Sequence, residues 1–175
     1  QNSSEKILEK FDPSRTKQEG IDPQIAGLTR HILTDESTRP TTNDFDWNLL
    51  LQLGDYDNGA KTGTSNRRVE NPNFDEERPE DEEENSKEIT APGDSWTIGF
   101  TPHLVSGVWV GNNDGAPMVP GATGMTLAAP VWKKFMLDAH EVLKAQFLEA
   151  NPDKSEKDFV ERLYPFVGLE ERKIN

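Results

Sequence analysis

Apolar residues recur at helical spacing in two parts of the chain. In the first part, Ile25, Leu28 and Ile32 lie three or four residues apart, and Asp22 followed by Pro23 supplies a helix cap and a first helical residue. This pattern predicts a helix from about residue 22 to 35. A second helix is predicted from about residues 127–130 to Asn151, with a buried stripe formed by Val131, Phe135, Ala139 and Val142 and joined by Trp132, Met136 and Leu143. A shorter helix is expected over about residues 155–163.

Between the two long helices the spacing changes to that of strands. Trp96, Ile98 and Phe100 alternate with smaller or polar residues, which is typical of a half-buried strand. Residues 101–103 predict a turn, and residues 104–110 an antiparallel return strand. Because this return strand is apolar on both faces, we expect it at the centre of the sheet. With a further strand around Lys61, the pattern predicts an α+β fold, an antiparallel sheet flanked by helices.

The domain organisation follows from the polarity of the remaining segments. Residues 1–20 are polar and are expected to form a loose arm, residues 21–148 the folded part, and residues 149–175 a charged helical extension. Residues 36–58 are expected to be a connecting loop. The indole of Trp47 in this loop is interpreted as part of the core rather than as a substrate contact.

Negative charge is concentrated in one segment. The chain has a formal net charge of −13, and residues 70–88 contain ten acidic and two basic residues, which supply −8 of that charge. Dense acid with prolines and few apolar residues predicts a solvated, poorly ordered insertion over residues 67–93. The acids lack the spacing of a calcium loop. This charge also repels nucleic acid and anionic lipid, so neither is expected as a partner.

Composition sets further limits. With 175 residues the chain could form one domain, but 33% hydrophobic residues and a mean hydropathy of −0.79 are low for a self-sufficient core. The chain has no cysteine, and His31, His103 and His140 lack the spacing of a metal site, so neither metal nor cofactor is expected. No apolar run approaches the roughly 18 residues of a spanning helix. Any membrane anchor is therefore expected in sequence that lies outside this chain.

The most informative chemistry lies in residues 59–66, Gly-Ala-Lys-Thr-Gly-Thr-Ser-Asn. In an extended strand, Lys61 and Gly63 point to one face while Thr62 and Thr64 point to the other. Gly63 leaves room for the backbone of a ligand to lie close to the strand. A cation, hydroxyls and a glycine in this arrangement predict an exposed strand edge that captures a carboxylate or an oxyanion.

Several blocks after Lys61, taken together and in this order, resemble one enzyme family. They are residues 94–102, 104–112, 124–126, 128–132 and 135–136. The series resembles the C-terminal half of the transpeptidase domain of class A penicillin-binding proteins, the bifunctional peptidoglycan glycosyltransferase/D,D-transpeptidases. The resemblance covers roughly residues 20–140. Lys-Thr-Gly is also the third motif of the serine penicillin-binding and β-lactamase superfamily.

The resemblance implies a partial penicillin-binding transpeptidase fold and a role for each residue of the Lys61 strand. The hydroxyls of Thr62 and Thr64 would bind the terminal carboxylate of a D-alanyl-D-alanine stem peptide or of a β-lactam. The Thr64 N–H would be one oxyanion donor, and Lys61 would supply positive potential and help to position the proton path. Lys61 and Thr64 are thus the candidate catalytic residues, while Thr62, Gly63, Thr64 and Ser65 form the candidate substrate-binding edge.

Two further motifs of that superfamily, S-x-x-K and S-x-N, should precede Lys-Thr-Gly. Ser3 and Ser14 each begin a literal S-x-x-K, but they lie in a polar stretch interrupted by Pro13 and Gly20, and no S-x-N follows before Lys61. We interpret both strings as decoys. The nucleophile is therefore expected outside this chain, in a missing N-terminal half of a larger enzyme at the extracytoplasmic face of a bacterial membrane. The chain by itself should be inactive.

The sequence raises two alternatives to this function. Residues 54–62 nearly spell the phosphate-binding G-x-x-x-x-G-K-[ST], but Ala60 shifts the lysine by one position, and Asp55 and Asp57 place negative charge where phosphates would bind. The other alternative is a non-catalytic module that keeps the fold and binds the cell wall or another protein.

Overall fold

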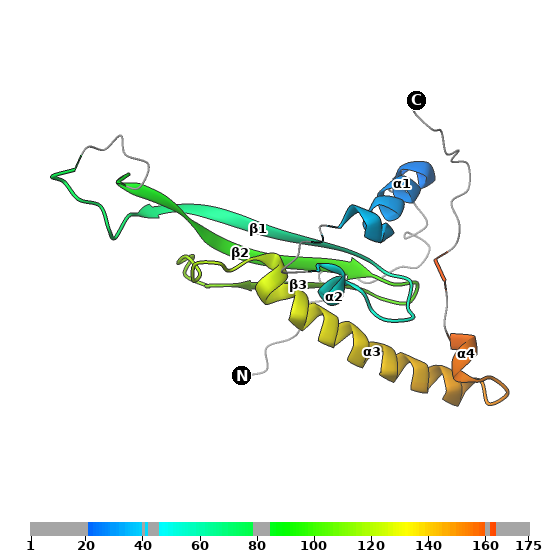
Figure 1. Ribbon diagram of the computed structural model, residues 1–175. Coiled ribbons are helices and arrows are strands. Elements are labelled where there is room, and N and C mark those ends of the chain that lie inside the picture. Colours follow the sequence, from blue (N-terminus) through cyan, green and yellow to red (C-terminus); the bar gives the residue numbers. More distant parts are fainter. Residues whose placement is uncertain (1–20, 40, 42–45, 79–84, 160–161, 164–175) are drawn as a thin grey trace, which may run out of the picture.

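A three-stranded antiparallel sheet forms the centre of the molecule (Figure 1). The computed structural model describes residues 21–39, 41, 46–78, 85–159 and 162–163. Strands β1 (Gly59–Glu70), β2 (Glu88–Phe100) and β3 (Val105–Gly111) lie side by side in that order. The expected arm over residues 1–20 and most of the extension after residue 159 lie outside the described residues.

The described residues also form helices, so the α+β arrangement expected from the sequence is present. They are α1 (Pro23–Thr34), α2 (Asn48–Leu51), α3 (Ala129–Ala150) and α4 (Glu156–Phe159), with a short 3-10 turn η1 (Glu36–Thr38) and a π-helical turn η2 (Gly124–Ala128). The predicted start of α1 is confirmed, because the Asp22 carboxylate accepts hydrogen bonds from the N–H groups of Gln24 at 2.8 Å and Ile25 at 3.4 Å. The expected helix over residues 155–163 is shorter, a single turn at α4.

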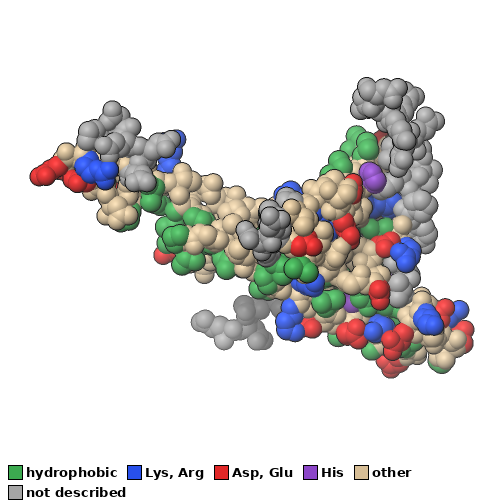
Figure 2. Space-filling model, viewed as in Figure 1, with side chains coloured by type: hydrophobic (Ala, Val, Ile, Leu, Met, Phe, Trp, Pro, Cys, Tyr) green, Lys and Arg blue, Asp and Glu red, His purple; other side chains and the backbone are tan. Residues whose placement is uncertain are grey.

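The hairpin of β1 and β2 is longer than the sequence pattern predicted. The two strands pair from Gly59 with Phe100 to Glu70 with Glu88, with one register shift between Ser65 and Asn66. Residues 67–70 and 88–93 of the expected insertion are therefore strand, and the excursion begins only at residue 71. Figure 1 shows this part of the hairpin as an arm that extends away from the helices, and Figure 2 shows acidic side chains at its end.

The described part of the excursion is organised by buried amide side chains. Asn85 accepts a hydrogen bond from the Asp75 N–H at 2.8 Å and donates to the carbonyls of Asp75 and Arg78, both at 2.9 Å. Asn85 is fully buried. Residues 79–84 of the expected insertion, with five of its acids, lie outside the described residues. The charge-rich composition carried no signal for a turn built around one asparagine.

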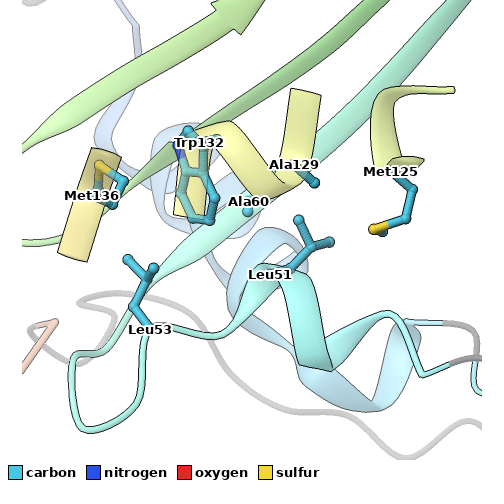
Figure 3. Close-up of a cluster of buried hydrophobic side chains, with 7 residues drawn as sticks. All are labelled: Leu51, Leu53, Ala60, Met125, Ala129, Trp132 and Met136. Carbon is cyan, nitrogen blue, oxygen red and sulfur yellow. The ribbon is translucent and has the colours of Figure 1, made fainter. Parts of the chain in front are cut away.

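The core lies between the sheet and α3. Leu51, Leu53, Ala60, Met125, Ala129, Trp132 and Met136 form one buried cluster (Figure 3). The predicted buried face of α3 is confirmed at Trp132 and Met136, which are fully buried, but it was wrong at Val131, Phe135 and Val142, which are 53%, 50% and 57% exposed. His140, which is also fully buried, was not part of the prediction. The larger indole, which periodicity alone ranked as an addition to the stripe, decides which side of α3 faces the sheet.

The two faces of β2 are used in an unexpected way. Ser95 and Thr97 are fully buried under η2, where their hydroxyls donate to the carbonyls of Thr123 at 2.8 Å and Gly124 at 3.0 Å. Trp96 and Ile98, on the opposite face, are 45% and 51% exposed. The alternation of the strand was predicted correctly. Its polar face, however, is the face that the described helices cover.

The position of β3 also differs from the prediction. Within the described part of the chain β2 is the central strand, and β3 lies at the sheet edge with Val105 and Trp109 exposed. The apolar residues on both faces of β3 predict a central strand, and this prediction was wrong for the described sheet. Here these residues produce a hydrophobic surface over the sheet, and further hydrophobic side chains are visible over α1 (Figure 2).

The predicted turn after β2 is confirmed and is held by a buried histidine. The Thr101 N–H donates to the Leu104 carbonyl at 2.8 Å, while the Thr101 hydroxyl accepts from the N–H groups of His103 and Leu104. His140 contacts the Met136 carbonyl through Nδ1 at 2.7 Å and the Thr101 hydroxyl through Nε2 at 2.9 Å. Since a carbonyl only accepts, Nδ1 carries the proton and Nε2 accepts from Thr101. His140 is thus a structural histidine.

Gly99 is required by the packing of α3 on the sheet. A Cβ at this position would overlap the Trp132 ring and lie 2.8 Å from the Gly59 carbonyl oxygen. We expect Gly99→Ala to lower the free energy of unfolding by about 1–3 kcal/mol, the usual effect of overpacking. The midpoint of urea unfolding measures this loss. Gly63→Ala is the matched control, because its Cβ would meet only the Trp96 Cβ at 3.8 Å, and equal losses in the two variants would contradict the prediction.

Candidate functional site

The strand that carries Lys61 presents an open edge. Among the described residues no strand pairs with the side of β1 that faces away from β2. Lys61, Gly63, Thr64 and Ser65 are exposed and Thr62 is half-buried. The edge is therefore extended and accessible over the stretch that the sequence singled out.

The backbone of this edge alternates in direction. In an antiparallel pair, alternate residues exchange both hydrogen bonds with the partner strand, and the residues between them turn N–H and C=O away. The Lys61 ammonium donates to the Thr62 carbonyl at 2.5 Å, which places that carbonyl on the outer side. Thr64 lies two positions further along an unbroken register, so its N–H and C=O also point outward. Both groups are available to an added strand.

Thr64 is held from the other side by the turn that precedes α3. Its hydroxyl accepts a hydrogen bond from the Gly124 N–H at 2.9 Å and keeps its own proton to donate. Gly124 lies so close to the strand that a Cβ there would be 2.9 Å from the Gly63 nitrogen and 2.7 Å from the Gly63 oxygen. Sequence reasoning placed Gly124 in a family-like block but gave it no role. In the structure it supports β1 beneath Gly63 and Thr64.

Asp94 connects all three strands at the end of this stretch. Its carboxylate accepts hydrogen bonds from the Ser65 hydroxyl at 2.6 Å and the Trp109 Nε1 at 3.1 Å, and it forms an ion pair with Arg67 at 3.3 Å. The hydrogen bonds from Ser65 and then Trp109 lower the pKa of Asp94 below its ordinary value of 3.8. The register shift of the hairpin follows directly after Ser65.

This contact changes what Ser65 can do. The Ser65 proton is committed to Asp94, so the hydroxyl can offer only its lone pairs to a ligand. Asp94 itself was missed as a site-building residue, although it lies in one of the blocks that carry the resemblance. The feature that reveals its role is that it lies opposite Ser65 in the register of the hairpin. This feature can be recognised only once the strand pairing is known.

A cavity of about 420 Å³ borders the start of β1. Three consecutive β1 residues, Ala60, Lys61 and Thr62, line it. Because their side chains alternate between faces, a cavity that touches all three lies at the strand edge rather than on one face. The remaining wall is mostly apolar and comes from α1, α2 and the residue before α2, through Ile32, Leu33, Leu51 and Trp47.

Two cations line this cavity, Lys61 and Arg39. The Arg39 guanidinium donates to the Asn48 side-chain oxygen at 3.2 Å and to the Leu33 carbonyl at 3.3 Å. Burial lowers the pKa of Arg39, while Glu36 and Asp35 act in the opposite direction. Among the described residues, the two hydrogen-bond acceptors of Arg39 are neutral, as is the carbonyl that Lys61 contacts. Sequence reasoning gave Arg39 no role, since nothing in the pattern joined it to Lys61.

Other kinds of site find less support. A phosphate-binding loop would need Lys61 in a loop before a helix, whereas Gly59–Glu70 is one strand that leads into the hairpin arm. No group of three or more histidine, aspartate and glutamate side chains is arranged for a metal ion among the residues that the structure describes. Within the same residues, no helix has the length and hydrophobicity needed to span a bilayer.

Comparison with known proteins gives one partial match. No family model and no solved structure matches the chain. Over 43 residues, the chain is 37% identical to penicillin-binding protein 1A of Aquifex aeolicus. This match covers 25% of the chain and 6% of that protein. The short match suggests a relation to penicillin-binding proteins, in agreement with the resemblance stated above.

The lowered pKa of Asp94 predicts a pH dependence of stability. A carboxylate whose pKa is lower in the folded than in the unfolded state stabilises the fold above the unfolded pKa, and this contribution is lost as the pH falls through the folded pKa. For Asp94 this stabilisation is therefore lost below about pH 4, because its pKa in the folded chain lies below the ordinary aspartate pKa. We expect Asp94→Asn to flatten the decrease in unfolding midpoint between about pH 5 and pH 2 relative to the unsubstituted chain.

The matched control is Asp138→Asn, which removes a carboxylate on α3 whose side chain is 65% exposed and pairs with Lys134. Urea midpoints at closely spaced pH values are the measurement. If Asp138→Asn flattens the decrease of the urea midpoint at low pH as much as Asp94→Asn does, the Asp94 contacts have no special role.

Proposed function

We propose that this chain is the C-terminal part of a serine-type D,D-transpeptidase that cross-links peptidoglycan stem peptides and binds penicillin. The observation that carries the proposal is the open edge of β1, on which Lys61-Thr62-Gly63-Thr64 is extended and Thr64 directs its N–H outward. The short match to a penicillin-binding protein adds independent support. The finer fold assignment, a partial penicillin-binding transpeptidase fold, belongs to the same proposal.

In the proposed complex a stem peptide adds to β1 as an antiparallel strand. Its backbone pairs with the outward N–H and C=O groups of Thr62 and Thr64, which is the usual mode of β-strand addition. Pairing at Thr62 requires the Lys61 ammonium to leave the carbonyl it contacts in the free chain. Gly63 keeps the approach open because it has no side chain. The hydroxyls of Thr62 and Thr64 then donate to the terminal carboxylate of the peptide.

The proposed reaction is an acyl transfer in two steps. A serine hydroxyl attacks the carbonyl carbon of the penultimate residue, its proton passes to the departing nitrogen, and the C–N bond to the terminal residue breaks. The serine is left as an ester, which an amine of a neighbouring stem then attacks to form the cross-link and restore the serine. The Thr64 N–H stabilises the oxyanion that forms in each step, an effect worth about 3 kcal/mol per donor.

Lys61 has a distinct part in this proposal. Once displaced from the Thr62 carbonyl, its ammonium lies at the edge where negative charge develops, and it raises the local positive potential. The nucleophilic serine and its own lysine are assigned to sequence outside this chain. A membrane anchor and a position at the extracytoplasmic face of the bacterial membrane are assigned in the same way.

The exposed apolar surfaces support a missing half. Trp96, Ile98 and Trp109 form an uncovered side of the sheet, and Val131 and Phe135 an uncovered side of α3. Such surfaces mark sites of contact with other parts of a protein. In the proposal, the sheet surface packs on the helical half that carries the serine.

Fluorescent penicillin labelling of the longer protein that carries this chain tests the proposal. We expect Lys61→Ala to lower the second-order rate of acylation about 100-fold or more, because a positioned catalytic cation is lost. Thr64→Ala should lower it about 10- to 100-fold through loss of a hydrogen bond to a carboxylate, whereas Thr64→Ser, which keeps the hydroxyl, should remain within about threefold.

Controls for this experiment lie away from the edge. Thr90→Ala removes an exposed strand hydroxyl on the hairpin arm, and Lys134→Ala removes an exposed ammonium on α3. Both should be acylated at the unsubstituted rate. A longer protein that takes no label would refute the enzyme and favour a non-catalytic module that retains the fold. The enzyme would also be refuted if Lys61→Ala and Thr64→Ala left the rate of acylation of the longer protein unchanged.

The isolated chain provides a separate prediction. Because the proposed nucleophile lies outside it, the 175-residue chain should form no covalent adduct with a penicillin. Intact-mass spectrometry after prolonged incubation is the measurement, with a known penicillin-binding enzyme as positive control. An adduct on Ser3 or Ser14 would show that one of the literal S-x-x-K strings is functional.

A further inference from the structure

The cavity at the start of β1 has the composition of an anion site built into an apolar pocket. Its walls are aliphatic and aromatic, and its polar members are the two cations Arg39 and Lys61 and the hydroxyl residues Thr38 and Thr62. A ligand that fits such a pocket carries one negative group next to an apolar body, since small-molecule pockets combine apolar walls with a few oriented polar groups.

Arg39 is suited to bind that negative group. Its guanidinium has five N–H donors, and the described residues use two of them, with neutral acceptors. These two bonds, to Asn48 and Leu33, fix the side chain between α1 and α2 without neutralising its charge. A charge-assisted hydrogen bond from this partly buried guanidinium to a carboxylate is stronger than one from an exposed guanidinium, because water screens it less.

The direction of the proposed peptide decides which part of it reaches Arg39. A strand that runs antiparallel to β1 has its carboxyl end toward Gly59, the first residue of β1. The cavity is bordered by Ala60, Lys61 and Thr62, and thus lies at that same end. The group that arrives there is the terminal residue of the peptide, which the reaction releases.

We propose that this cavity receives the carboxyl-terminal residue of the bound peptide and that Arg39 is an additional anchor for its terminal carboxylate. Thr62 supplies a hydroxyl from the strand side, and the apolar wall contacts the side chain of the departing residue. This inference rests on the proposed function, because the direction and the end of the ligand are taken from it. Arg39 thereby acts on substrate recognition and does not take part in proton transfer.

The test compares two penicillins on the same preparation of the longer protein. One carries the free carboxylate, and in the other a primary carboxamide replaces it. We expect the unsubstituted protein to react about 10- to 100-fold faster with the carboxylate. Arg39→Gln should reduce this preference by slowing the reaction with the carboxylate alone, while Thr62 and Thr64 still bind that group. Arg39→Lys, which keeps the charge without the planar fork, should be intermediate.

The ratio of the two rates separates recognition from stability. A variant that is partly unfolded loses reactivity toward both compounds equally, so its ratio stays unchanged. Arg68→Gln, which removes a guanidinium 84% exposed on the hairpin arm, is the matched control and should keep the full preference. An unchanged ratio in Arg39→Gln overturns the inference while leaving the transpeptidase intact. Absence of any acylation in the unsubstituted protein overturns both.

Discussion

The close contact between the turn before α3 and the hairpin ladder is the interaction on which the candidate site depends. Gly124 touches the backbone at Gly63 and donates to the Thr64 hydroxyl, while Ser95 and Thr97 satisfy carbonyls of the same turn from the neighbouring strand. One element thereby fixes both the height of β1 above the core and the orientation of Thr64. The indole of Trp132 continues this contact over Gly99 and ties it to the buried cluster.

Electrostatics then distinguish the two ends of the exposed stretch. At its beginning, Lys61 and Arg39 border a cavity, and the hydrogen-bond acceptors that they contact among the described residues are neutral. At its end, Asp94 accepts hydrogen bonds from Ser65 and Trp109 and forms an ion pair with Arg67, so that the charges of Asp94 and Arg67 offset each other. A peptide along β1 would meet positive potential at its carboxyl end and a closed polar network at the other.

The sequence predicted what depends on local chemistry. The Asp22 cap, the turn at Thr101, the alternation of β2 and the extended Lys61 strand are all set by neighbouring residues, and the structure has them. The sequence did not predict which faces of the sheet and of α3 are covered. On α3 the predicted residues Trp132 and Met136 are buried, but Val131, Phe135 and Val142 are exposed, because the large indole of Trp132 decides which side of the helix faces the sheet. Among the described residues β3 is an edge strand, because strand order depends on pairing partners distant in sequence. Asp94 and Arg39 were missed for the same reason, since their importance arises from register and from a cavity between four elements. The roles of Lys61, Thr62, Gly63, Thr64 and Ser65 stay predictions.

The Lys61 ammonium on the Thr62 carbonyl also bears on solubility. An unpaired strand edge invites pairing between copies of a chain, and proteins commonly guard such edges with a lysine or with a bulge. Here the lysine covers the outward carbonyl of Thr62, and the register shift after Ser65 interrupts the regular edge a few residues later. The same side chain that is proposed to serve a bound substrate would, in the absence of substrate, hinder a second copy of the chain from pairing along this part of β1.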